Sequence, residues 1–384
     1  MAANKNHHFV PQFYLRNFGN QRTIGLYNIA RGVHMPSVSI RRQCQRAHLY
    51  GPDPTLERDL SRLEALAASA VSGILSSGTP PAWGSPAYVH LVEFVALQWG
   101  RTPAAGAGLE TLATDLMRAL LRDKVGTVVD EFRMRTDRPE VESLLAALAG
   151  SHLLLDLQPK LLINRTDMEF ITSDSPVVLR NPWCRDVRGR TTVGLASQGL
   201  QVFLPLSPSQ VLILYDDAVY TVGRAGDPSV DIGTTYEVTG INRLQLLVAD
   251  ENLFHSGSER AARAIDELPL KRCQARSRTV RVLRTETSGS NSLRIQACGE
   301  APNVKLDISH IRLREEAKRI PVAERAVQIR EGSRLADMVW RRARGDLREV
   351  VYTTDSPVFS AKLFGTSPAP AADQEPTGPS GRHT

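Results

Sequence analysis

Apolar residues recur at helical spacing in the first half of the chain. Within residues 55–78, leucine, isoleucine and alanine return every three or four positions, which predicts an amphipathic helix. A second helix is expected over residues 86–100, because a serine precedes its opening proline and its apolar residues form one stripe. Further helices are expected at about 109–123 and 139–149. Residues 55–150 are therefore predicted to form a helical layer.

The second half of the chain carries short β-favouring runs instead. Between residues 161 and 214 these runs are separated by Asp, Asn, Gly and Pro, which predicts a mostly antiparallel sheet. Residues 234–249 and 259–268 have helical spacing, and residues 23–40 alternate around a glycine-containing break that predicts a β-hairpin. Because helices and strands are segregated along the chain, the expected fold class is α+β.

The C-terminal part differs in composition from the rest. Residues 5–265 are expected to form the main domain, and residues 270–364 an appended basic α/β subdomain. Within the subdomain, residues 278–285 alternate basic and apolar side chains like an exposed strand, and residues 320–344 have the spacing of a helix. The Pro, Ala, Ser and Gly content of residues 366–384 predicts a disordered tail.

Composition narrows the class of protein. With 384 residues and 42% hydrophobic content, the chain can build a sizeable core. It shows no signal peptide and no long apolar stretch, so a cytoplasmic protein without a membrane segment is expected. The four cysteines are scattered, which argues against a zinc ribbon or a disulfide framework. The net charge of +6 comes almost entirely from arginine and points only weakly to nucleic acid. Nothing in the sequence defines the oligomeric state.

The stretch over residues 7–18 concentrates chemically active side chains. It contains two imidazoles, an amide, a phenol and a guanidinium beside a proline and three phenylalanines. Such side chains can donate, accept, ligate or stack, so the stretch is a candidate site. Its phenylalanines and leucine are too apolar to remain in water, so it is also expected to be largely buried.

The run HHFVPQFYLRNF at residues 7–18 resembles the opening signature of a bacterial family known only as a domain of unknown function, the DUF four-two-three-eight family. Three later blocks fit the same family, namely 97–103, 170–177 and 205–208. The resemblance spans roughly residues 5–260. It implies membership and marks residues for scrutiny, but it brings no established activity.

Two residues are candidates for catalysis. His8, three residues before Pro11, partly matches the first half of a ββα-metal nuclease motif, in which an imidazole is the general base beside a metal ion. A divalent metal is therefore a candidate cofactor, although the sequence defines no ligand set for it. Asp174 follows a β run and either projects from a strand end as a functional group or caps the turn before Ser175 and Pro176.

The sequence leaves an enzyme and a binding module open. The first hypothesis is a nuclease-like phosphodiesterase that processes nucleic acid, with His8 as base or ligand, Asp174 as metal ligand, and Arg16 and Arg101 on phosphate. In the alternative, purely structural interpretation, Arg101 only stabilises the end of a helix. An enzyme of this kind requires His8, Asp174 and the arginines to converge in one pocket.

The second hypothesis is a non-catalytic module that binds nucleic acid or another ligand. In that case Tyr14 and Arg16 would grip or stack on the ligand, with Gln12 beside them, and basic residues near the C-terminus would add affinity. Nucleic acid is a candidate partner under either hypothesis.

Overall fold

The computed structural model describes residues 6–51, 54–187, 192–270, 280–286, 293–299, 306, 308–325 and 328–343. The chain divides into two compact units, Met1–Asp337 and Met338–Thr384, and only the last helix, α10 (Glu331–Ala343), runs across the division. The predicted boundary near residues 265–270 stays a prediction. The predicted tail and part of the predicted basic subdomain lie outside the described residues.

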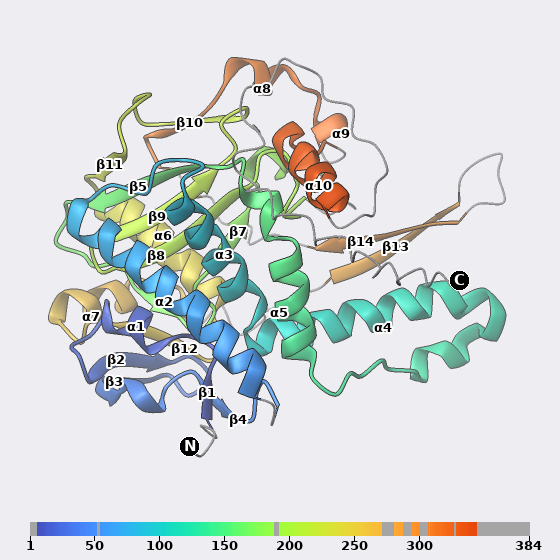
Figure 1. The fold of residues 1–384 in the computed structure, drawn as a ribbon, viewed down its shortest axis with the longest axis horizontal. Coiled ribbons are helices and arrows are strands. Elements are labelled where there is room, and N and C mark those ends of the chain that lie inside the picture. Colours follow the sequence, from blue (N-terminus) through green and yellow to red (C-terminus); the bar gives the residue numbers. More distant parts are fainter. Residues whose placement is uncertain are drawn as a thin grey trace, which may run out of the picture. The chain divides into compact units, whose positions relative to one another are not determined.

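A five-stranded sheet forms the centre of the first unit (Figure 1). Its strands, in spatial order, are β11 (Ser229–Ile232), β5 (Gln158–Asn164), β9 (Gln210–Tyr215), β8 (Gln201–Ser207) and β7 (Val178–Arg180). Neighbouring strands are antiparallel, except that β11 runs parallel to β5. Together with the helices, this confirms the predicted α+β class and the mostly antiparallel sheet.

Helices cover both faces of this sheet because successive strand residues point to opposite sides. Leu204 and Leu206 of β8 pack in one core with α2 (Pro54–Ser77) and α3 (Pro86–Gly100). Phe203 of the same strand packs in a second core with α6 (Thr235–Val248). The remaining helices of the predicted helical layer are α4 (Pro103–Val125) and α5 (Pro139–Ala149).

The predicted helix ends follow from local chemistry. The side chain of Ser85 accepts a hydrogen bond from the backbone N–H of Tyr88 and so caps α3. Thr102 caps α4 in the same way, through the N–H of Ala105, so α4 begins at Pro103, before its predicted start at about residue 109. Gly78 follows α2 with φ of +67°, a conformation that glycine adopts without a steric penalty.

A second, four-stranded sheet carries the N-terminal part of the chain. Its order is β3 (Val33–Ser39), β2 (Thr23–Asn28), β12 (Asn252–His255) and β6 (Thr172–Ser173). The hairpin of β2 and β3 confirms the prediction for residues 23–40. Next to it, β1 (Asn6–His8) pairs with β4 (Gln45–Ala47), and α1 (Gln12–Arg16) follows β1.

The later part of the first unit contributes to two further two-stranded sheets. In one, β15 (Ile311–Leu313) pairs with β10 (Tyr220–Val222), and in the other β13 (Val280–Glu286) pairs with β14 (Leu293–Gly299). The short helices are α7 (Glu259–Asp266), α8 (Glu315–Arg319), α9 (Val322–Arg325), η1 (Ile40–Arg42), η2 (Gly126–Glu131), η3 (Ser151–Leu154) and η4 (Pro182–Cys184).

The helix expected at 320–344 is interrupted. Between α9 and α10, Ile329 forms an isolated β-bridge with Ser197, and the N–H of Arg330 donates to the carbonyl of Ala196. These contacts hold Ile329 and Arg330 in extended backbone before α10 begins. Among the described helices, none combines the length and apolar character needed to cross a bilayer.

Candidate functional site

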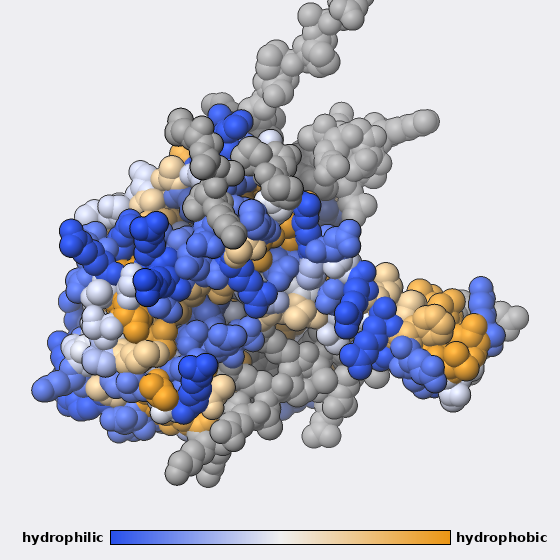
Figure 2. Space-filling model, turned by 90° about the horizontal axis from the view of Figure 1, so that it is seen from below, coloured by the Kyte–Doolittle hydropathy of each residue, from blue (hydrophilic) through white to orange (hydrophobic). Residues whose placement is uncertain are grey.

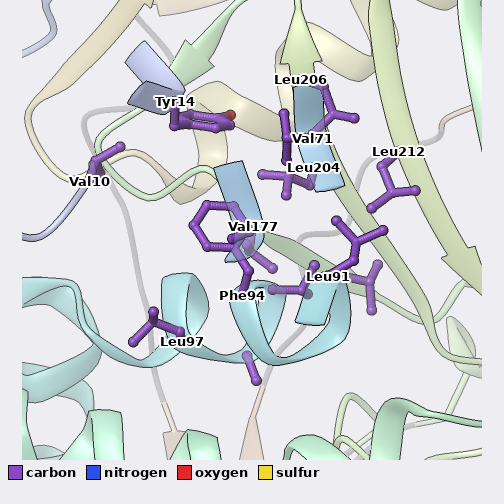
Figure 3. Packing of buried hydrophobic residues seen from close by; sticks show 14 of the residues in the cluster. Val10, Tyr14, Val71, Leu91, Phe94, Leu97, Val177, Leu204, Leu206 and Leu212 are labelled. Atoms are coloured by element: carbon purple, nitrogen blue, oxygen red, sulfur yellow. The ribbon is translucent and has the colours of Figure 1, made fainter. Parts of the chain in front are cut away.

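The opening stretch is largely buried, as the sequence predicts. Val10, Tyr14, Leu15 and Phe18 are each at most 1% exposed. Figure 3 shows Tyr14 beside Phe94 of α3 in the core that also contains Leu204 and Leu206 of β8. Their burial stabilises the attachment of β1 and α1 to the rest of the unit.

The Tyr14 hydroxyl joins three distant segments. It donates a hydrogen bond to the carbonyl of Pro205 at 2.6 Å, and its oxygen lies 2.7 Å from the hydroxyl of Thr172. Because the tyrosine proton is used by Pro205, Thr172 is the donor in the second bond. Burial raises the pKa of Tyr14, so the phenol stays protonated. Tyr14 therefore binds the protein itself through its polar atom.

Gln98 and Arg101 connect the same stretch to the helical layer. The amide nitrogen of Gln98 donates to the carbonyl of Phe9 at 2.9 Å, and its oxygen accepts from two nitrogens of Arg101 at 2.8 and 3.2 Å. Arg101 is fully buried and forms an ion pair with Glu64 of α2 at 2.6 Å. Arg101 does lie at the end of α3, as predicted, but its charge is neutralised by a neighbouring helix.

The two histidines of the stretch have different surroundings. His7 accepts from the N–H of Tyr50 at 3.1 Å, stacks on the ring of Tyr50, and lies 3.3 Å from Glu57. His8 lies 3.2 Å from the carbonyl of Arg41, and a carbonyl only accepts, so Nε2 of His8 carries the proton. Burial lowers the pKa of His8, which keeps this imidazole neutral near pH 7. Its Nδ1 is then the atom that could accept a proton.

Asp174 organises a turn. Its two carboxylate oxygens accept the backbone N–H groups of Asp250, Glu251 and Asn252 at 2.6, 2.7 and 2.9 Å. Burial raises the pKa of Asp174 to about 6, while the three amides act in the opposite direction by stabilising the ionised form. The carboxylate thus holds the connection between α6 and β12, 76–78 residues further along the chain, which is a structural role in a turn other than its own.

The predicted site residues converge only in part. His8 and Arg101 lie within electrostatic range of each other, and the thiol of Cys44 lies within range of both Arg101 and Asp174. Arg16 is exposed, and its guanidinium contacts the Gln12 side chain at 3.3 Å on the surface of α1. In the described part of the chain, no three His, Cys, Asp or Glu side chains gather closely enough to hold a metal ion.

Replacing Asp174 by asparagine is expected to lower the free energy of unfolding by about 2–4 kcal/mol, because a carboxylate that accepts three amides becomes a group with one acceptor and an opposing donor. Chemical denaturation followed by circular dichroism measures the change. The matched control is Asp59→Asn on the surface of α2, which should alter stability by less than about 0.5 kcal/mol. Equal stability of the two variants would contradict the structural role of Asp174.

A separate pocket of about 460 Å³ lies on the α6 side of the main sheet. Arg180 of β7 and Gln201 of β8 are direct cross-strand partners, so their side chains share one face, and both line this pocket. The Arg180 guanidinium lies over the Phe203 ring at 5.9 Å from its centroid. Both side chains are buried, at 4% and 1% exposure, although both carry polar groups.

Gln201 is unusual among the polar residues of this pocket. The Tyr220 hydroxyl accepts from the N–H of Trp183 and donates to the carbonyl of Gly199, and the indole N–H donates to the carbonyl of Ala317. In contrast, neither the oxygen nor the nitrogen of the Gln201 amide has a hydrogen-bond partner in the described part of the chain. A buried amide without partners is rare and requires an explanation.

Sequence reasoning did not select Arg180 or Gln201, although each leaves a signal. Arg180 directly follows the apolar run of β7, and Gln201 directly precedes the apolar run of β8. A polar residue at an inward position beside such a run indicates either an internal partner or a ligand. Only the strand register shows that the two positions face each other.

The family comparison matches residues 6–259 to a family described as "Protein of unknown function (DUF4238)". The chain belongs to this family. The DUF4238 segment contains all four sequence blocks that carry the resemblance. Three of these blocks contact one another through the Tyr14 hydroxyl. The fourth block contains Gln98, whose amide donates to the carbonyl of Phe9. Arg180 and Gln201 also lie in the DUF4238 segment, whereas β15 lies beyond it. Among curated proteins and among solved structures, no match is found.

Proposed function

We propose that this DUF4238 protein is a ligand-binding module that holds a small organic anion in the pocket at Arg180 and Gln201. The observation that carries the proposal is the Gln201 amide, which is buried at 1% exposure with both polar atoms unpartnered and lines the same pocket as a buried cation. A volume of about 460 Å³ is in the range of small-molecule sites.

The chemistry of the two side chains defines the ligand class. A guanidinium donates through several N–H groups in a fixed plane, which suits the paired oxygens of a carboxylate or phosphate. The Gln201 amide can donate to one such oxygen and accept from a hydroxyl or protonated oxygen of the ligand. Leaving a buried amide unpaired costs about 1–3 kcal/mol, so a ligand that satisfies it recovers this energy on binding.

The phosphodiesterase hypothesis rests on His8 and Asp174. A neutral His8 with an available Nδ1 is compatible with a general base. However, both oxygens of Asp174 already accept backbone amides, and Tyr14 and Arg101 are bound within the protein. These contacts favour the binding module over the enzyme. Nucleic acid stays a predicted partner, and phosphate esters fall within the proposed ligand class.

The isosteric variant Gln201→Glu is expected to test the pocket directly. Its carboxylate would lie opposite Arg180 and imitate the head of the ligand, so the melting temperature should rise while binding of added anions is lost. Scanning fluorimetry and isothermal titration calorimetry with acetate and methyl phosphate, at constant ionic strength, measure the two effects. Gln201→Leu removes the unpaired polar atoms and should weaken anion binding at least tenfold without destabilising the free protein.

The matched control is Gln12→Glu, which places the same charge beside Arg16 on the surface of α1. This variant should bind the anions as the unchanged protein does. A Gln201→Glu variant that melts at a lower temperature would contradict the proposed pocket. Anion binding that changes in Gln12→Glu but not in Gln201→Glu would place the site in the opening stretch.

A further inference from the structure

We infer that the ligand of this pocket is an amphipathic acid, with its anionic head at Arg180 and Gln201 and an aliphatic body lying against β15. This inference rests on the proposed function and adds the class of molecule that the pocket selects. It follows from how polar and apolar groups are divided between the two walls of the pocket.

The polar wall and the apolar wall come from different parts of the chain. The polar wall consists of Arg180 of β7, Gln201 of β8, and Arg185 and Asp186, which follow η4. The apolar wall consists of Ile308 and of Ile311 and Leu313 of β15. An anion held at Arg180 and Gln201 therefore shares the pocket with this hydrocarbon.

The direction of the β15 side chains is set by strand alternation. Ile311 and Leu313 line this pocket, whereas His310 and Arg312 line a separate hollow on the other side of the strand. Thr221 of β10 likewise lines that second hollow, while its neighbour Tyr220 lines the pocket. The pairing of β10 with β15 thus turns one apolar face toward Arg180 and Gln201.

The apolar wall is held in place and offers no free polar group from Ser309. The hydroxyl and the backbone N–H of Ser309 both donate to the same oxygen of Glu237 on α6, at 2.8 and 2.9 Å. At the other end of β15, the N–H of Arg314 donates to the carbonyl of Val219 at 2.9 Å. With these groups satisfied, the described part of this wall interacts with a ligand through its hydrocarbon surface.

The aromatic residues of the pocket behave in the same way. The hydroxyl of Tyr220 and the indole N–H of Trp183 both have partners in the protein, so their rings face the pocket as apolar surface. In contrast, both polar atoms of the Gln201 amide are buried without a hydrogen-bond partner among the described residues. A molecule with charge at one end and hydrocarbon along its length matches this distribution, while a ligand that is polar throughout would leave groups unpaired against β15.

The position of the apolar wall has a consequence for the family. Head recognition by Arg180 and Gln201 lies within residues 6–259, which match the family model, whereas β15 lies outside them. Selection of the ligand body is therefore assigned to a segment of this chain beyond the family-matched part.

Calorimetric titration of the full-length protein with straight-chain carboxylates from acetate to octanoate tests the inference. Burying one methylene contributes about 0.8 kcal/mol, so affinity should rise about fourfold per added carbon until the pocket is filled. A parallel series from methyl to octyl phosphate identifies the head group, since the series that binds more tightly at equal chain length contains the preferred head.

Variants of β15 separate the two walls. Leu313→Asn should weaken octanoate binding about tenfold, and Leu313→Phe should shorten the chain length at which affinity stops rising. Arg312→Ala, on the opposite side of the same strand, is the matched control and should leave the whole series unchanged. Leu313→Phe keeps the wall apolar, so it remains informative if Leu313→Asn does not fold.

The outcomes distinguish this inference from the proposed function. If affinity does not depend on chain length while Gln201→Glu still abolishes anion binding, the binding module stands and the amphipathic ligand is wrong. If the unchanged protein binds neither series and Gln201→Glu does not raise the melting temperature, both the binding module and the amphipathic ligand are wrong. An increase with chain length that Leu313→Phe and Leu313→Asn leave unaltered would place the ligand body elsewhere and overturn the role of β15.

Discussion

Deletion of residues 1–18 is expected to leave a chain that does not fold cooperatively. The deletion removes β1, α1 and the fully buried side chains of Val10, Tyr14, Leu15 and Phe18. At about 1.5–3 kcal/mol for each buried side chain, the loss is about 6–12 kcal/mol, which is comparable to the whole stability of a typical domain. Thermal melting followed by near-ultraviolet circular dichroism, together with size-exclusion chromatography, measures the result.

The matched control for this deletion is a chain that lacks only residues 1–5 and keeps β1 and α1. It should melt within a few degrees of the full chain. A chain without residues 1–18 that melts at the same temperature as this control would show that the opening stretch does not stabilise the fold.

Replacing Glu64 by glutamine is expected to lower the free energy of unfolding by about 3–5 kcal/mol, because Arg101 is then left as a fully buried cation without its carboxylate. Urea denaturation measures the change. The double variant Glu64→Leu with Arg101→Met removes both charges and should recover most of the loss, since a buried ion pair replaced by apolar residues is often neutral in stability.

The comparison of the single and double variants decides the role of this ion pair. Arg62→Met, which removes an exposed arginine from a longer pair with Asp59, is the control and should cost no more than about 1 kcal/mol. If the double variant is less stable than Glu64→Gln, the ion pair between Arg101 and Glu64 stabilises the fold more than the apolar pair that replaces it.

Helices and sheet strands could be predicted from the sequence because their signals are local. The stripe of α2, the serine before α3 and the short runs of the main sheet each lie within one window of the chain. The burial of residues 7–18 was also predictable, because it follows from the apolar content of the stretch. The break between α9 and α10 was not, since it depends on Ser197, which is remote in sequence.

The roles of the polar residues could not be predicted in the same way. The density of polar groups in residues 7–18 suggested chemistry, but Tyr14 finds its partners 158 and 191 residues away, and Gln98 reaches Phe9 across 89 residues. Whether such a group serves the protein or a ligand depends on contacts that no local pattern contains. It stays a prediction that one functional set is formed by His8, Gln12, Arg16, Arg101 and Asp174.

The same limit explains why the pocket was missed. Arg180 and Gln201 each look like one polar residue at the edge of a buried strand. Their pairing depends on the antiparallel register of β7 and β8, and the unpaired state of Gln201 depends on everything around it. A single sequence contains both residues, but it does not show that they pair across neighbouring strands.

The pairing of β2 with β12 affects how this protein is made. Residues 25–28 of β2 bond to residues 252–255, so the ribosome must add more than two hundred residues before β2 obtains its second neighbour. At about 5–20 residues per second this takes on the order of 10–45 s. During that interval the nascent hairpin of β2 and β3 presents an open strand edge that can pair with other chains. Chaperones that shield nascent chains are therefore expected to act on this hairpin before the rest of the molecule.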